Sequence, residues 1–198
     1  FPLDDFQLEA IDALNQGHSV VVSAPTGSGK TLVGEYAIHR ALAHGQKVFY
    51  TTPLKALSNQ KLRDFREAYG DDNVGLMTGD LSVNREASIV VMTTEIFRNM
   101  LYAEASEHDD PLADVEAVVL DECHYMNDSQ RGTVWEESII HCPPSVQLVA
   151  LSATVANAGQ LTDWIEKVHG PTTLVLSDYR PVPLQFSFCS AKGLHPLL

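Results

Sequence analysis

Cysteine is scarce in this sequence. Its 198 residues include three, Cys123, Cys142 and Cys189, and their spacing is irregular. An odd and sparse set excludes a disulfide framework and is typical of a reducing compartment, so we expect a cytoplasmic protein.

Long apolar runs are missing as well. No stretch of 18 apolar residues occurs, so we expect no membrane span and no membrane partner. The opening "FPLDDFQ" has neither the basic nor the apolar region of a signal peptide, and it lacks an initiator Met. We therefore expect a piece of a longer protein. With 44% hydrophobic and 20% charged residues, the composition is that of a soluble globular domain with one core.

Positive charge is in short supply. Lys and Arg number 13 against 26 acidic residues, for a net charge of −13. Proteins that bind nucleic acid are usually basic, so this balance weighs against a broad nucleic-acid surface. One segment departs from it, the predicted helix 54–69, whose four basic residues outnumber its two acids. A local strip of this kind can follow phosphates, and it consists of Lys55, Lys61, Arg63 and Arg66.

Short apolar runs alternate with helical patterns along the chain. The runs are almost continuously apolar, as strands buried on both faces must be. We predict strands at 18–24, 47–53, 87–94, 117–122, 146–154 and 172–178. We predict helices at 3–17, 30–44, 54–69, 95–105, 133–141 and 156–169. This alternation predicts an α/β fold with a mostly parallel sheet and helices on both faces; the Pro-rich tail predicts an exit strand and linker.

A glycine-rich loop follows the first predicted strand and opens a helix. It reads "SAPTGSGKT", and its glycines allow tight turns that bring backbone N–H groups close to phosphate oxygens. Lys30 would reach the β- and γ-phosphates, and the Thr31 hydroxyl would bind Mg²⁺. Ala24 stands where the usual P-loop pattern begins with Gly, and the alternative is an ordinary glycine-rich turn. The predicted ATP-binding residues here are Ala24, Pro25, Thr26, Gly27, Ser28, Gly29, Lys30 and Thr31.

A pair of acids follows the apolar strand "AVVL". A P-loop needs a carboxylate on the far side of the metal, and Asp121 supplies it. Glu122 would then orient and deprotonate the water that attacks the γ-phosphate. An acid in this position favours a hydrolase over a P-loop kinase, which brings its own acceptor.

A zinc site and a nucleophilic cysteine are the alternative interpretations of "DECH". Adjacent Cys123 and His124 make a poor pair of zinc ligands, since neighbours on a strand point to opposite faces, and no C-x₂-C spacing occurs in the chain. A nucleophilic Cys123 is disfavoured because neighbouring acids raise the pKa of a thiol. Packing is the simpler role for this cysteine.

Together these segments resemble a known family. "APTGSGKT", "DECH" and "SAT" are similar to motifs I, II and III of superfamily 2 helicases of the DExH-box kind. "LDDFQLEAI", "PLKALSNQK", "VGLMTGD", "VMTTEIFRNML", "RGTVWEE", "LSATVANA" and "RPVPL" resemble the superkiller-type (Ski-like) RNA helicases. The similarity runs from Leu3 to about Leu184. It implies a RecA-like P-loop NTPase fold and ATP hydrolysis coupled to movement along RNA.

The resemblance also implies roles for individual residues. Phe6 and Gln7 would contact adenine, and His124 would link the γ-phosphate site to the nucleic-acid side as a further catalytic residue. Ser152, Ala153 and Thr154 would relay the nucleotide state to the RNA groove. The implied RNA path is lined by Pro53, Leu54, Lys55, Thr78, Gly79, Asp80, Thr93, Thr94 and Arg98.

In this family the ATP site lies between two RecA-like domains. The resemblance therefore implies a first, ATP-binding domain at 1–184 and an exit segment at 185–198 toward a second domain. We expect the isolated chain to bind nucleotide weakly and to hydrolyse ATP poorly. RNA, the second domain and proteins of RNA degradation or processing are the expected partners. A DNA helicase of the same superfamily and a non-catalytic ATP- or RNA-binding scaffold are the alternatives.

Overall fold

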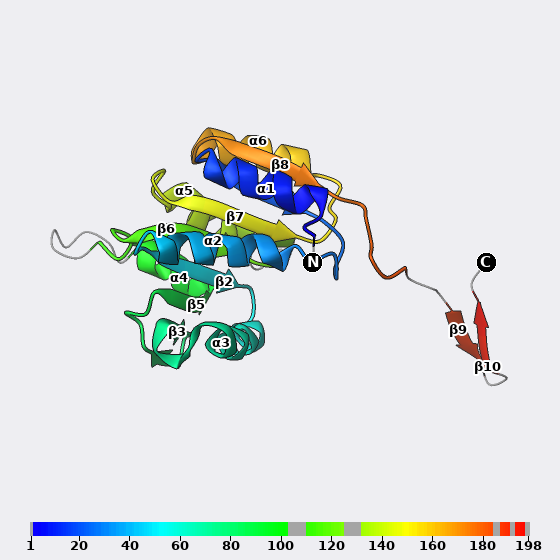
Figure 1. The fold of residues 1–198 in the computed structure, drawn as a ribbon, viewed down its shortest axis with the longest axis horizontal. Coiled ribbons are helices and arrows are strands. Elements are labelled where there is room, and N and C mark those ends of the chain that lie inside the picture. Colours follow the sequence, from blue (N-terminus) through cyan, green and yellow to red (C-terminus); the bar gives the residue numbers. More distant parts are fainter. Residues whose placement is uncertain (1, 103–109, 125–131, 184–186, 191–192, 197–198) are drawn as a thin grey trace.

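The computed structural model describes residues 2–102, 110–124, 132–183, 187–190 and 193–196. Helices and strands alternate along most of this length (Figure 1). The α-helices are α1 (Asp5–Asn15), α2 (Thr31–Ala43), α3 (Lys55–Tyr69), α4 (Thr94–Tyr102), α5 (Gly132–His141) and α6 (Ala158–Val168), and a 3₁₀ turn covers Asp71–Asn73. The strands are β1 (Ser19–Ser23), β2 (Lys47–Thr52), β3 (Val74–Met77), β4 (Ser82–Val83), β5 (Ile89–Thr93), β6 (Val115–Leu120), β7 (Gln147–Ser152), β8 (Thr172–Leu176), β9 (Ser187–Ser190) and β10 (Gly193–Pro196).

The predicted α/β fold is confirmed. Within the described residues, β1 to β8 form one sheet in the order β4-β3-β5-β2-β6-β7-β1-β8. All its neighbouring strands pair in parallel except β3 and β4, which are antiparallel. A parallel sheet carries its functional side chains at the carboxyl ends of its strands. In this order, the ends of β6, β7 and β1 are neighbours, and so are the ends of β2, β5 and β3.

Helices cover both faces of the sheet, as predicted. One core lies between the sheet and α1, α2 and α3, with Leu14, Ile38 and Phe65 among its buried members. The second lies beneath α4, α5 and α6, with Phe97 and Ile139 among its buried members. Strands β1 and β5 are buried at every position because each contributes side chains to both cores.

Several predicted boundaries needed correction. Strand β6 begins at Val115 and ends at Leu120, so Asp121 and Glu122 belong to the turn that follows it. For the helix predicted at 95–105, the expected end at Ala105 lies outside the described residues. The tail forms the antiparallel pair β9–β10 where a single exit strand and linker were predicted. No helix in the described segments is long and apolar enough to cross a membrane.

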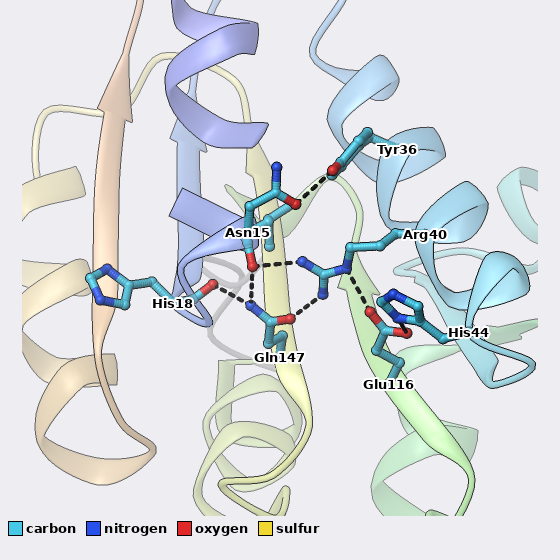
Figure 2. A network of polar contacts seen from close by, with 8 residues as sticks. Asn15, His18, Tyr36, Arg40, His44, Glu116 and Gln147 are labelled. Carbon is cyan, nitrogen blue, oxygen red and sulfur yellow. Dashed lines mark hydrogen bonds and ion pairs between the residues drawn. The ribbon is translucent and has the colours of Figure 1, made fainter. Parts of the chain in front are cut away.

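A polar network ties the elements together at the amino ends of the strands (Figure 2). The Arg40 guanidinium, near the end of α2, pairs with Glu116 at 2.5 Å and donates a 2.6 Å hydrogen bond to the Leu14 carbonyl oxygen. It also donates to the Gln147 side-chain oxygen, and the Gln147 amide donates to the carbonyl oxygens of Leu14 at 3.0 Å and His18 at 2.8 Å. This network fixes the end of α2 that lies farthest from the glycine-rich loop.

Candidate functional site

The glycine-rich loop connects β1 to α2 at the carboxyl edge of the sheet. Gly27 and Gly29 have φ values of +83° and +86°, which L side chains rarely adopt. Between them, the Ser28 N–H donates a 3.1 Å hydrogen bond to the Pro25 carbonyl oxygen. The loop ends at Lys30, the N-cap of α2, and Thr31 is the first helical residue. A helix N-terminus behind a tight glycine loop is a favourable site for anions.

Two buried polar side chains of this loop, Ser28 and Lys30, could bind a negatively charged ligand. Lys30 is 6% exposed, and no ion pair joins it to another described residue. The buried hydroxyl oxygen of Ser28 likewise has no hydrogen-bond partner in the described structure. Buried polar groups are normally satisfied, so the two side chains fit an anion held by the loop.

Gln7 braces the loop from α1. Its Nε2 donates a 3.0 Å hydrogen bond to the Gly29 carbonyl oxygen, and its Oε1 accepts one of 2.9 Å from the Asp4 N–H. A Cβ at position 29 would lie 2.9 Å from Gln7 Nε2, the end of a flexible side chain, so it is chiefly the φ of +86° that favours glycine here. Phe6, the other residue expected near adenine, is 6% exposed and packs into the core of α1 and α2.

Asp121 stands at the end of β6 with both carboxylate oxygens engaged. Oδ1 accepts a 2.9 Å hydrogen bond from the Glu122 N–H, and Oδ2 accepts one of 2.8 Å from the Tyr50 hydroxyl. The Lys61 ammonium lies 3.8 Å from Oδ2. Burial and the Asp121 charge raise the pKa of Tyr50 well above its usual value, so the phenol stays a donor. Neither Tyr50 nor Lys61 was expected at this site from the sequence.

Glu122 adopts an unusual backbone conformation. Its φ is +53°, in the left-handed region that costs a non-glycine residue about 1–2 kcal/mol. The turn directs its carboxylate toward His124, with Oε2 at 3.3 Å from Nδ1. Strain of this kind persists where the surrounding structure over-determines it, as it does at many functional sites.

His124 joins the acid pair to the segment that follows β7. Its Nδ1 accepts a 3.2 Å hydrogen bond from the Ala153 N–H. The same nitrogen lies 3.3 Å from Glu122 Oε2, so His124 contacts both the acid pair and the turn after β7. The predicted coupling residue Ala153 therefore lies directly against the acid row.

The hydroxyl groups on either side of Ala153 have different surroundings. Ser152 is fully buried and its hydroxyl donates a 2.8 Å hydrogen bond to the Ala153 carbonyl oxygen, while Thr154 is exposed. The Ser23 hydroxyl donates a 3.4 Å bond to the same carbonyl and accepts one of 3.3 Å from the Val155 N–H. The turn after β7 is thereby held to the end of β1, where the glycine-rich loop begins.

Cys123 faces the interior. It is 3% exposed, and burial raises its pKa to about 12, with a smaller opposing effect from a hydrogen bond with Ser152. A thiol of this kind is inert at neutral pH.

The residues predicted to line an RNA path gather at the carboxyl ends of β2, β5 and β3. Lys55 pairs with Asp80 across this region, and the Thr78 hydroxyl donates a 3.1 Å hydrogen bond to the same aspartate. The Thr94 hydroxyl donates a 3.2 Å bond to the Thr52 carbonyl oxygen. Around them, Pro53 and Leu54 are half-buried, Gly79 is exposed, Thr93 is buried, and Arg98 lies 3.4 Å from Glu137.

The basic side chains expected to form a strip on α3 are less available to an external ligand than the sequence indicates. Lys61 is 19% exposed and turns toward Asp121, while Lys55 and Arg66 pair with Asp80 and Asp71. Arg63 is exposed. The charge that α3 offers to an external phosphate is therefore smaller than the count of its basic residues.

Known proteins are similar to this chain in sequence and fold. The chain is 58% identical to the DExH-box ATP-dependent RNA helicase DExH15, chloroplastic, of Arabidopsis thaliana, and 49% identical to the antiviral helicase SKI2 of Saccharomyces cerevisiae. Both matches cover 100% of this chain, which spans only 17% and 15% of the two relatives. The Mycobacterium smegmatis helicase Lhr, in a structure bound to ssDNA and AMP-PNP, matches with a TM-score of 0.68 and 28% identity over 87% of this chain and 25% of that one. The family model of DEAD/DEAH box helicases matches residues 4–161, and the chain belongs to this family.

Proposed function

We propose that this chain is the ATP-binding motor domain of an ATP-dependent RNA helicase. We assign residues 1–184 to the first RecA-like domain and 185–198 to the exit segment toward a second one. The observation that carries the proposal is the division of the sheet's carboxyl edge. The glycine-rich loop and the acid pair occupy the ends of β1 and β6, and hydroxyl and basic side chains occupy the ends of β2, β5 and β3. Within the first group, the His124–Ala153 hydrogen bond joins the turn after β6 to the turn after β7.

The donors at the loop and the acid pair fit Mg²⁺ with a nucleotide. The Thr31 hydroxyl and the Asp121 carboxylate are the hard oxygen ligands that this ion prefers. When bound, the ion would neutralise charge on the phosphates. Lys30 would stabilise the β- and γ-phosphates, Ser28 would donate to a phosphate oxygen, and Glu122 would accept the proton of the attacking water.

RNA is the proposed substrate, because the curated relatives above include a named RNA helicase at 58% identity over the whole chain. A DNA helicase is the second candidate, favoured by the resemblance to Lhr in a structure with ssDNA. The second RecA-like domain and proteins of RNA degradation or processing are the proposed partners. The three free thiols support a reducing, cytoplasmic setting.

The test is ATP turnover by the full-length protein with RNA and DNA of one sequence. We expect RNA to stimulate turnover strongly and DNA to do so weakly, and Glu122→Gln to abolish turnover while nucleotide still binds. Equal stimulation by DNA would favour the second candidate. Turnover that survives Glu122→Gln would contradict the proposed site.

The isolated chain provides a second measurement. In related NTPases an arginine from outside the first domain contributes about 10³–10⁵-fold to the rate. We expect this chain alone to bind Mg²⁺-nucleotide weakly and to turn it over slowly, with little response to RNA. Rapid RNA-stimulated turnover by the chain alone would mean that its active site needs no second domain, and would contradict this part of the proposal.

A further inference from the structure

Tyr50 is locked in place by three elements. It is fully buried on β2, and its ring contacts Phe65 of α3 edge-on with the ring centroids 4.9 Å apart. On the α2 side, a Cβ at Gly34 would lie 3.3 Å from the Tyr50 ring, so glycine allows this close approach. A ring held this tightly has one position for its hydroxyl, and that position is 2.8 Å from Asp121 Oδ2.

Lys61 approaches the same carboxylate oxygen from α3. Its ammonium lies 5.3 Å from the centre of the Tyr50 ring and 5.8 Å from that of Phe65, within the range of cation–π attraction. It is 3.8 Å from Asp121 Oδ2, and the two side chains are 19% and 9% exposed. Because both side chains are largely shielded from solvent, their interaction is stronger than that of a surface pair.

We propose that Tyr50 and Lys61 are positioning residues for Asp121, which set the direction and the effective charge of the carboxylate that holds the metal. The Tyr50 hydroxyl fixes the side-chain rotamer from Oδ2, while the Glu122 N–H fixes it from Oδ1. Lys61 neutralises part of the carboxylate charge and so opposes the binding of a second cation. The proposal rests on the proposed function only in taking Asp121 as a metal ligand.

The two residues should affect the metal in opposite directions. Loss of the Tyr50 hydroxyl removes one of the two hydrogen bonds that hold the Asp121 carboxylate, and the loss of such a supporting hydrogen bond typically weakens metal binding about tenfold or more. Loss of the Lys61 charge removes a repulsion close to the metal position, so metal binding should become several-fold tighter. If either residue had a purely structural role, its loss would change the melting temperature without these opposite effects on metal binding.

The experiment measures Mg²⁺-dependent binding of a fluorescent ATP analogue to the full-length protein, without RNA and without turnover. The readout is the Mg²⁺ concentration at half-saturation. We expect it to rise about tenfold in Tyr50→Phe, which keeps the ring, and to fall about threefold in Lys61→Met, which keeps the apolar stem. Lys61→Arg, which retains the positive charge, should stay within twofold of the unmodified protein.

Two further variants make the outcome interpretable. Lys167→Met removes an exposed lysine of α6 and should leave the midpoint unchanged. Asp121→Asn should abolish the Mg²⁺ dependence; if it does not, Asp121 is not the metal ligand and the proposed function is at fault. If Asp121→Asn abolishes it but Tyr50→Phe leaves the midpoint unchanged, or Lys61→Met raises it, the positioning proposal is overturned.

Discussion

The side-chain amide of Gln7 donates a 3.0 Å hydrogen bond to the carbonyl oxygen of Gly29, across 22 residues of sequence. The Oε1 atom of the same amide accepts a hydrogen bond from the Asp4 N–H, so one side chain joins the start of α1 to the glycine-rich loop. A carboxylate at this position could keep the second bond but not the first. It would also add negative charge beside the proposed phosphate site.

Gln7→Glu is therefore expected to weaken nucleotide binding about tenfold, from a lost hydrogen bond together with repulsion of the phosphates. Titration with a fluorescent ATP analogue measures the affinity. Gln16→Glu, at the exposed C-cap of α1, introduces the same charge at the opposite end of the helix that carries Gln7 and should have no effect. Equal affinities for Gln7→Glu and the unmodified protein would show that this bond does not support the loop.

The sequence was sufficient to predict β1, β2, β5, β6, β7 and β8. The first five are almost entirely buried, as continuous apolar runs indicate, while β8 lies at the sheet edge and is mostly half-buried. The sequence did not reveal β3 and β4. Strand β3 is four residues long with Gly75 inside it, and β4 is two exposed residues at the sheet edge. Gly75 has a packing reason that its local sequence does not disclose. A Cβ there would lie 2.0 Å from the Asn84 carbonyl oxygen, which follows β4.

The glycine-rich loop and the acid pair could be placed from local patterns, since each lies at the end of one strand. The supporting side chains could not, because their contacts depend on which strands are neighbours. Tyr50 reaches Asp121 across 71 residues only because β2 pairs with β6. In the sequence Tyr50 is one more aromatic residue in an apolar strand, and Lys61 is one more cation on a helix.

The strained turn at Glu122 gives a stability prediction that is separate from catalysis. At a φ of +53°, alanine keeps the steric cost of a Cβ and glycine does not. We expect Glu122→Gly to have a free energy of unfolding about 1 kcal/mol higher than Glu122→Ala, although both variants would lack the proposed general base. Chemical denaturation of the isolated chain compares them. If alanine is as stable as glycine, the left-handed conformation does not strain the protein.

The network in Figure 2 predicts a large effect from a site far from the nucleotide. The Arg40 and Glu116 side chains are 12% and 11% exposed. Arg40→Met would leave the Glu116 carboxylate without its guanidinium partner, and we expect a loss of about 3 kcal/mol of unfolding free energy. Glu116→Gln in the same chain should recover part of this loss, because it removes the carboxylate charge that has lost its guanidinium partner and keeps, among the described residues, only the contact with His44.

Denaturant unfolding of the two single variants and the double variant measures the coupling between Arg40 and Glu116. A useful comparison is Arg85→Met, which removes a cation that is 67% exposed in its side chain and, within the described part of the chain, forms an ion pair only with its neighbour Glu86. That change should cost less than about 0.5 kcal/mol. Additive losses in the double variant would mean that the Arg40–Glu116 contact contributes little to stability.

The buried thiols predict how stability depends on alkaline pH. Burial raises the pKa of both Cys123 and Cys142 from 9.0 to about 12. Between these values an unfolded chain releases the two protons and the folded chain retains them. The stabilisation is therefore complete below about pH 9 and is lost as the pH rises toward 12, with a slope of about 1.4 kcal/mol per pH unit for each thiol.

Denaturant unfolding at several pH values from 8 to 10.5 tests this slope. The double variant Cys123→Ala, Cys142→Ala should show a shallower fall in unfolding free energy over that interval than the unmodified chain. Cys189→Ala removes an exposed thiol and should leave the slope unchanged. Tyr50, whose pKa is also raised by burial, should add to the fall only above about pH 10. An unchanged slope in the double variant would mean that the two thiols titrate alike in the folded and unfolded chain.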